Sequence, residues 1–254
     1  MSEILSPLQA LRYSRQLMLP ALDFRGQEAL LASKVLLVGM GGLGCAAAPY
    51  LVASGIGALT LVDNDVIDRS NLQRQILYRE QDIGQPKVIT ALQQLKQLNS
   101  EIQLSALQQR LDHTALAQLV PQFTLVLDCT DNLLTRNAIN SACVQAGIPL
   151  VSAAAIRFEG QLLSLRNQPG DPCYQCLSRF FGEQQLSCME AGILSPVVGV
   201  LGVMQALAAV KILAAVGEPE YHQLKLFDAL SGQWQQFQLS ADPKCPVCHS
   251  RKEY

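Results

Sequence analysis

Three glycines in the chain have the spacing of a phosphate-binding turn, G-x-G-x-x-G. Gly39, Gly41 and Gly44 follow the apolar run 35–38, a pattern typical of a parallel strand that is buried on both faces. In such a turn the first glycine permits the tight bend, the second lets a phosphate approach the backbone, and the third lets the next helix pack closely. Because the amides at that helix start attract anions, we expect nucleotide binding here.

A carboxylate follows the next apolar run. Residues 58–62 predict another buried strand, and this strand ends in Asp63. In nucleotide-binding folds, an acid at this place accepts a hydrogen bond from a ribose hydroxyl. A turn that is merely structural is the alternative, but strand, turn, helix and acid occur together in the order that nucleotide binding requires.

Side chains suited to binding phosphate are concentrated in residues 66–87. Arg74 offers a planar fork of donors, Lys87 a compact positive charge, and Asn71 and Gln75 offer amides. Taken alone, the two cations could be ordinary surface charges. Because they follow a phosphate-binding turn, we expect them to extend the nucleotide site.

Two aspartates lie at the exit of a third predicted strand, residues 125–127. Open α/β sheets bind their ligands at the carboxyl ends of the strands. Either Asp128 or Asp131 could hold a magnesium ion that bridges phosphates, and either could instead cap the next helix. The sequence leaves both interpretations open.

Four cysteines form two C-x-x-C pairs with the spacing of metal ligands. Cys173 and Cys176 make the first pair, and Cys245 and Cys248 make the second. Together they supply the four thiolates of a tetrahedral structural zinc site, which would fasten the end of the chain to its middle. Two independent redox or disulfide pairs are the alternative.

The elements that must position these residues alternate between strand and helix. Beyond the strands already named, the patterns predict strands at 102–107, 149–153 and 160–165, helices at 87–97 and 134–146, and a hairpin at 224–227 and 234–239. This order predicts an α/β fold with a doubly wound, mostly parallel, Rossmann-like sheet and a mixed or antiparallel C-terminal part.

The composition excludes several classes of protein. With 254 residues, 49% of them hydrophobic, the chain is long enough for a large core. The net charge of −2 does not suggest a nucleic-acid binder. The N-terminus lacks the pattern of a secretion signal, so we expect a cytoplasmic protein whose cysteines serve metal binding or chemistry and not disulfides.

Two further segments have a helical pattern. Residues 6–33 carry Arg12 and Arg15 on one predicted helix face, which by itself suggests a solvated surface. Residues 196–216 are almost free of charge, and a membrane span would fit their length. Because Gln205 and Lys211 interrupt the segment, we expect no stable membrane insertion and favour a buried helix at a domain or subunit interface.

The motifs together resemble a known family. The chain contains, in order, RYSRQ (12–16), GMGGLG (39–44), DND (63–65), SNLQRQ (70–75), Lys87, DCTDN (128–132), the two C-x-x-C pairs and, between those pairs, LSCMEAG around Cys188. This set resembles the MoeB/ThiF family, the bacterial relatives of ubiquitin-activating enzymes, over nearly the whole chain. CLSRFFGE and AAIRFEGQ are closer to the MoeB branch, whereas RYSRQ and LQQRL are closer to the ThiF branch.

The resemblance implies a reaction and its partners. The reaction is ATP-dependent adenylation of the C-terminal glycine of a small ubiquitin-like sulfur carrier that ends in Gly-Gly, with release of pyrophosphate. A MoaD-like carrier implies thiocarboxylate formation for molybdenum cofactor biosynthesis; the alternative is ThiS in thiamine biosynthesis. The implied cofactors are ATP, Mg²⁺ and structural Zn²⁺, and the implied assembly is a homodimer.

The resemblance also implies roles for individual residues. Asp131 would hold magnesium, Arg74 and Lys87 the triphosphate, and Arg15 the γ-phosphate in the neighbouring subunit. Cys188 would act, if at all, in sulfur loading of the carrier. The nucleotide would be bound by Gly39, Gly41, Gly42, Gly44, Asp63, Asp65, Ser70, Asn71, Gln75 and Asn132.

The expected organisation is one adenylation domain with three parts. Residues 1–33 would form a helical arm, 34–155 the nucleotide-binding core, and 156–254 the part for the carrier, the dimer and zinc. Two other functions share some of these features. An NAD-dependent oxidoreductase would use the same glycine turn and would retain an absorbing cofactor, whereas a noncatalytic scaffold would bind ATP without carrier-dependent pyrophosphate exchange.

Overall fold

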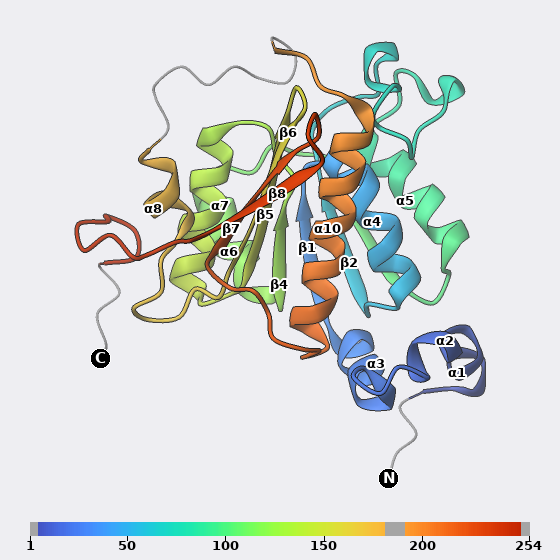
Figure 1. Cartoon of the computed structure of the whole chain (residues 1–254). Helices are drawn as coiled ribbons and strands as arrows, with labels where there is room; N and C mark the ends of the chain where they lie inside the picture. Colours follow the sequence, from blue (N-terminus) through green and yellow to red (C-terminus); the bar gives the residue numbers. More distant parts are fainter. Residues whose placement is uncertain (1–4, 181–190, 250–254) are drawn as a thin grey trace.

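A computed structural model of the chain describes residues 5–180 and 191–249, and a single sheet forms its centre (Figure 1). In the described residues this sheet has eight strands in the order β3-β2-β1-β4-β5-β6-β7-β8. The strands are β1 Lys34–Val38, β2 Ala58–Val62, β3 Gln103–Leu107, β4 Leu125–Asp128, β5 Leu150–Ile156, β6 Glu159–Leu165, β7 Gln223–Asp228 and β8 Gln233–Gln238. The first five strands run parallel, and β5 to β8 pair antiparallel, which confirms the predicted fold class.

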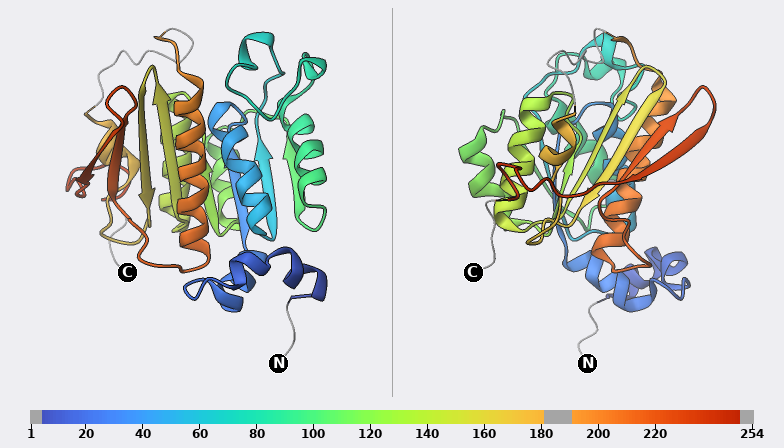
Figure 2. Two further views of the ribbon diagram at one scale, coloured as in Figure 1. Left: turned by 45° about the vertical axis from the view of Figure 1, so that its right-hand side comes forward. Right: turned by 60° about the vertical axis from the view of Figure 1, so that its left-hand side comes forward.

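Helices cover both faces of the sheet (Figure 2). One layer contains α4 Gly42–Ser54, α5 Lys87–Leu98 and α10 Ser195–Leu213; the other contains α6 His113–Leu119, α7 Leu133–Ala146 and α8 Tyr174–Ser178. Short 3-10 turns are η1 Arg69–Asn71, η2 Glu80–Asp82 and η3 Val120–Gln122. Each layer buries its own apolar cluster against the β-branched and leucine side chains of the strands.

The strand order creates a crevice between β1 and β4. From β1 the chain moves outward through β2 to β3, and it then returns to the other side of β1 as β4 and β5. The connections after β1 and β4 therefore lead away from each other at the carboxyl ends of these strands. Open α/β sheets bind ligands at such a point.

The apolar segment predicted at 196–216 forms α10, which packs in the core. It contacts α4, β5 and β6, and its buried side chains include Val198, Leu201 and Ala206. In the described part of the chain, α10 is the helix whose length and composition would suit a membrane span. Its packing against α4 and the sheet accounts for the apolar side chains on its buried face.

The N-terminal segment forms a helical arm beneath the sheet (Figure 1). It consists of α1 Pro7–Arg12, α2 Ser14–Leu17 and α3 Asp23–Ala32. Tyr13 anchors the arm, because its buried hydroxyl accepts a hydrogen bond of 3.0 Å from Asn99 Nδ2 and its ring lies against Gly55 at the end of α4. The arm therefore lies at the end of the sheet opposite the carboxyl ends of the parallel strands.

Two glycines of α10 provide a matched test of this packing. A Cβ on Gly202 would lie 2.5 Å from the carbonyl oxygen of Leu43 and 2.7 Å from Ala46 Cβ, whereas a Cβ on Gly199 would meet nothing within 4 Å. Gly202→Ala should lower the free energy of unfolding by about 1–3 kcal/mol, as overpacked cores do. Gly199→Ala should raise it by up to about 1 kcal/mol, because alanine favours the helix. Urea denaturation measures both; equal effects would contradict close contact between α4 and α10.

Candidate functional site

A cavity of about 1040 Å³ lies at the crevice where the chain reverses its direction across the sheet. It extends from the glycine turn to the strands β6, β7 and β8. Its walls include many of the residues that the sequence singled out, namely Gly39, Gly41, Gly42, Asp63, Asp65, Asn71, Arg74, Gln75, Lys87, Asp131 and Asn132.

At two positions of the glycine turn, backbone atoms occupy the place that a side chain would need. Gly39 has φ +99°, and a Cβ there would lie 2.7 Å from the carbonyl oxygen of Cys129 on the loop after β4. A Cβ on Gly44 would lie 2.1 Å from the carbonyl oxygen of Gly39. Gly44 thus allows the turn to close on itself and lies outside the cavity wall, whereas Gly41 and Gly42 face the cavity.

The carboxylate of Asp63 holds the glycine turn in place. Asp63 Oδ2 accepts a hydrogen bond of 2.7 Å from the backbone N–H of Met40, and Oδ1 accepts one of 2.8 Å from the backbone N–H of Asp65. The predicted ribose ligand is therefore also a structural partner of the turn. Its half-buried side chain still borders the cavity.

Lys87 reaches the cavity from the first residue of α5. Its ammonium donates a hydrogen bond of 2.7 Å to Asp65 Oδ2, and its side chain is only 7% exposed, whereas that of Asp65 is 58% exposed. An ammonium whose carboxylate partner is exposed can turn from it toward an incoming anion. The pair brings together two residues that the sequence predicted for the nucleotide site.

The segment that contains η1 supplies amides and a guanidinium. Arg74 borders the cavity, and its Nη1 donates a hydrogen bond of 3.1 Å to the carbonyl oxygen of Ser70. Asn71 borders it as well and accepts a hydrogen bond from the backbone N–H of Asp68. Gln75 is 3% exposed, and its Oε1 has no hydrogen-bond partner among the described residues. Ser70, a predicted nucleotide ligand, does not line the cavity, and its hydroxyl donates to Asp68 Oδ1 at 2.6 Å.

The structure gives Asp128 and Asp131 different surroundings. Asp128 is 1% exposed, and its Oδ2 accepts hydrogen bonds from Ser152 Oγ at 2.8 Å and from Arg136 Nη1 at 3.3 Å. Asp131 is exposed and lines the cavity. The cap of α7 is neither aspartate but Asn132, whose Oδ1 accepts a hydrogen bond of 2.9 Å from the backbone N–H of Thr135.

Arg136 is a residue of this region that the sequence interpretation missed. It is 4% exposed, lies one helical turn after Asn132 and forms part of the cavity wall. Burial alone would lower its pKa, but Asp128 and a hydrogen bond to the Tyr174 hydroxyl offset this, so the pKa of Arg136 is raised and the guanidinium stays charged. The available signal was its spacing, which places Arg136 on the same helix face as Asn132.

Arg15, which the resemblance assigns to a γ-phosphate, is not brought to the cavity. Arg15 lies in α2, at the opposite end of the sheet, where its Nη1 contacts Met18 Sδ at 3.8 Å. The cavity of its own chain is therefore out of its reach. Cys188 lies outside the described residues, so its role in sulfur loading stays a prediction.

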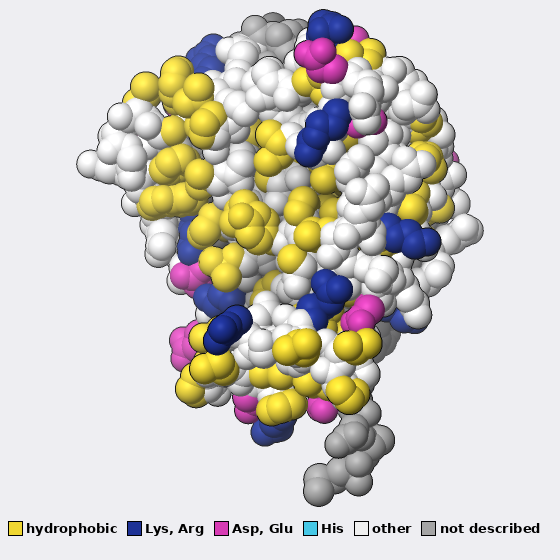
Figure 3. Space-filling view, turned by 90° about the vertical axis from the view of Figure 1, so that its right-hand side faces the viewer, with side chains coloured by type: hydrophobic (Ala, Val, Ile, Leu, Met, Phe, Trp, Pro, Cys, Tyr) yellow, Lys and Arg dark blue, Asp and Glu magenta, His cyan; other side chains and the backbone are white. Residues whose placement is uncertain are grey.

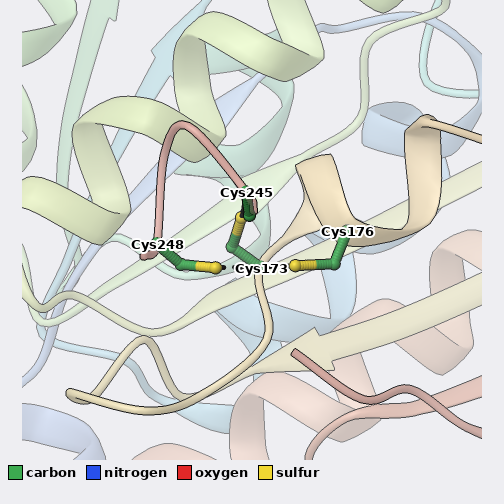
Figure 4. Close-up of side chains that lie close together, drawn as sticks. All are labelled: Cys173, Cys176, Cys245 and Cys248. Carbon is green, nitrogen blue, oxygen red and sulfur yellow. Dashed lines mark hydrogen bonds between the residues drawn. The ribbon is translucent and has the colours of Figure 1, made fainter. Parts of the chain in front are cut away.

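The four cysteines of the two C-x-x-C pairs converge (Figure 4). Their sulfur atoms all lie within 4.8 Å of one another, with 3.7 Å between Cys173 and Cys245 and 3.5 Å between Cys176 and Cys248. A tetrahedral zinc ion with Zn–S bonds of about 2.3 Å holds its sulfurs roughly 3.8 Å apart. The cluster therefore fits zinc, as predicted, and it joins the start of α8 to the segment after β8.

The ionisation of these four thiols also favours a bound cation. The hydrogen bond from Cys173 lowers the pKa of Cys176 to about 4, whereas burial and the neighbouring thiols raise the pKa of Cys248 to about 12. Four thiolates this close repel one another, so they cannot all ionise unless a positive ion lies between them.

Comparison with known proteins identifies the family. The model of the ThiF family matches residues 13–247. The chain belongs to the ThiF family.

Several known proteins are similar to almost the whole of this chain. It is 48% identical to the molybdopterin-synthase adenylyltransferase of Escherichia coli K12, over 96% of this chain and 98% of that protein. It is also 48% identical to the sulfur carrier protein ThiS adenylyltransferase of the same strain, over 94% of each. A structure of E. coli MccB with ATP matches with a TM-score of 0.81 at 25% identity, covering 94% of this chain and 74% of that chain.

A cysteine substitution tests the metal cluster. Cys245→Ala should abolish stoichiometric zinc and lower the melting temperature, because structural zinc contributes roughly 10 kcal/mol or more to folding. Cys143→Ala is the control, since Cys143 is equally buried but belongs to a different apolar cluster. It should keep its zinc. Metal analysis that finds no zinc in freshly purified wild-type protein would count against the site.

Proposed function

We propose that the chain uses ATP to adenylate the C-terminal glycine of a MoaD-like sulfur carrier for molybdenum cofactor biosynthesis. The observation that carries this proposal is the meeting of the glycine turn, Arg74, Lys87 and Asp131 in one cavity. An NAD-dependent oxidoreductase needs only the turn and Asp63, and it gives no reason for the two cations to converge there. The adenylyltransferase names of the similar proteins support the same conclusion.

The residues of the cavity suit phosphoryl chemistry. The carrier carboxylate attacks the α-phosphorus of ATP, the bond to the bridging oxygen breaks, and pyrophosphate leaves. A carboxylate is already ionised, so the step requires no general base, and the protein has only to position the reactants and neutralise negative charge. Arg74 and Lys87 provide donors for that charge, and Mg²⁺ held by Asp131 would neutralise part of it.

The far part of the cavity suits an extended peptide. Beyond the nucleotide residues, its walls include Gly160 and Gln161 of β6 and Gln233 and Gln235 of β8. A Cβ on Gly160 would lie 2.4 Å from Leu201 Cδ2, so glycine lets β6 approach α10 closely. We assign this part to the Gly-Gly tail of the carrier, in keeping with the expected role of residues 156–254.

ThiS is the alternative carrier. The identities to the molybdopterin-synthase and ThiS adenylyltransferases are both 48%, so they favour neither. Incubation of the protein with ATP and each carrier in turn, followed by mass spectrometry of the acyl-adenylate, distinguishes the two. Formation of no acyl-adenylate with either carrier would refute the proposed function.

Asp131 provides the sharpest test of the catalytic site. Asp131→Ala should leave folding intact and reduce carrier-dependent ATP–pyrophosphate exchange about a hundredfold or more, the scale of losing one strong electrostatic catalyst. Asp112→Ala is the control, because Asp112 is another exposed aspartate at a helix start but lies outside the cavity wall. It should lower stability by about 1 kcal/mol through loss of the cap and leave exchange unchanged. Near-normal exchange in Asp131→Ala would rule out its catalytic role.

The arm supports a homodimer in which Arg15 acts on the partner's nucleotide. Leu8, Leu11 and Met18 are each at least 70% exposed, and hydrophobic side chains gather on the lower part of the molecule where the arm lies (Figure 3). An apolar surface of this kind favours association. Because Arg15 lies far from the cavity of its own chain, contact with a nucleotide requires a second subunit.

Mixing two inactive variants tests this arrangement. Arg15→Ala and Asp131→Ala should each be inactive alone, but mixed dimers contain one cavity with both native residues. Exchange activity should therefore recover in part after the subunits are allowed to exchange. If native mass spectrometry shows mixed dimers and activity stays absent, Arg15 does not act across the interface.

A further inference from the structure

The strands β4 and β5 part directly below the cavity. Their pairing runs from Val126 and Leu150 to Asp128 and Ser152, and no pair follows in the described register. Beyond that point, the chain after β4 forms the loop 129–132, whereas β5 continues beside β6. Parting strands leave backbone carbonyls that need new partners if they are buried.

Arg136 supplies partners from the α7 face of the sheet. Its Nη2 donates to the carbonyl oxygen of Ala153 at 2.7 Å and also to the carbonyl oxygen of Thr130. Its Nη1 donates to Ser152 Oγ at 3.0 Å. One planar guanidinium therefore joins β5 to the loop that follows β4.

Gln205 supplies partners from the α10 face. Its Nε2 donates to the carbonyl oxygen of Asp128 at 2.9 Å and to that of Val151 at 3.3 Å, and its Oε1 accepts from Cys129 Sγ at 3.4 Å. It is 0% exposed and is the polar residue among the buried side chains of α10. A buried amide in an apolar helix is costly unless it is hydrogen-bonded, and here both of its polar atoms have partners.

We propose that Arg136 and Gln205 are positioning residues that clamp the loop 129–132 from both faces of the sheet and so place the Asp131 carboxylate in the cavity. This inference rests on the proposed function of Asp131. The Asp131 side chain makes no hydrogen bond to the described residues that would orient it, so its direction follows from the backbone around it. That backbone is held by Arg136 at Thr130 and by Gln205 at Asp128.

Gln205→Met tests the clamp because it keeps the length and apolar stem of the side chain but removes its hydrogen bonds. The Mg²⁺ concentration that gives half-maximal ATP–pyrophosphate exchange should rise about tenfold, as expected for a misplaced ligand, and the rate at saturating Mg²⁺ should stay within about twofold. Ala209→Gly is the control, because Ala209 is a buried residue one turn further along α10 that does not line the cavity. It should lower the melting temperature and leave the Mg²⁺ dependence unchanged.

A double-mutant cycle shows whether Gln205 acts through Asp131. In an Asp131→Ala background, Gln205→Met should change the residual exchange rate less than about twofold at any Mg²⁺ concentration. The same fold reduction in both backgrounds would overturn the proposal. If Gln205→Met does not fold, Arg136→Lys serves instead, since lysine keeps the charge beside Asp128 but cannot form the fork of hydrogen bonds.

Amide hydrogen exchange of the protein alone separates this inference from the proposed function. Residues 129–132 should exchange at least about tenfold faster in Gln205→Met than in the wild type and in Ala209→Gly, because the clamp is lost on one face. Unchanged protection there would overturn the positioning role. Wild-type protein that adenylates no carrier would refute the proposed function but would leave this measurement valid.

Discussion

The parting of β4 from β5 is the constraint on which the cavity depends. Parallel strands that stop pairing inside a fold leave carbonyls that water cannot reach, and a fold tolerates this only if side chains take over the lost hydrogen bonds. Arg136 and Gln205 do so from opposite faces. The loop that they hold lies against the glycine turn, because β1 pairs with β4 and Gly39 lies close to the carbonyl oxygen of Cys129.

The charged side chains of the cavity are held in place by hydrogen bonds within the protein. Lys87 donates a hydrogen bond to Asp65, and Asp63 accepts one from the glycine turn. Arg74 donates one to the backbone of Ser70. Groups that are already in place need not reorganise when charge develops on a phosphate, so their stabilisation is available to the transition state. Hydrogen bonds and ions can therefore stabilise the transition state of a reaction that needs no general base.

The cysteine cluster lies outside the cavity wall and has a different, structural task. It joins Cys173 and Cys176, at the start of α8, to Cys245 and Cys248, after the last strand (Figure 4). The strand β8 is exposed along its whole length and has a neighbour on one side only. A metal bound by the cluster would hold such an edge strand against the rest of the molecule, which the exposed side chains of β8 do not do by burial.

The sequence by itself determined the elements of the fold and the types of site. Apolar runs, G-x-G-x-x-G and two C-x-x-C pairs are local patterns, so the strands, the glycine turn and a cluster of four cysteines able to hold a metal could be predicted from them. Only the tertiary structure decided that Asp128 is buried beside Arg136 whereas Asp131 faces the cavity, and that Asn132 caps α7. It also decided that Gln205, which interrupts an apolar helix, donates hydrogen bonds to carbonyls of β4 and β5. Arg15, in turn, lies at the end of the sheet opposite the cavity. The physical reason is that burial and hydrogen-bond partners depend on which elements meet, and residues as distant in the chain as Gln205 and Asp128 carry no local signal of their contact.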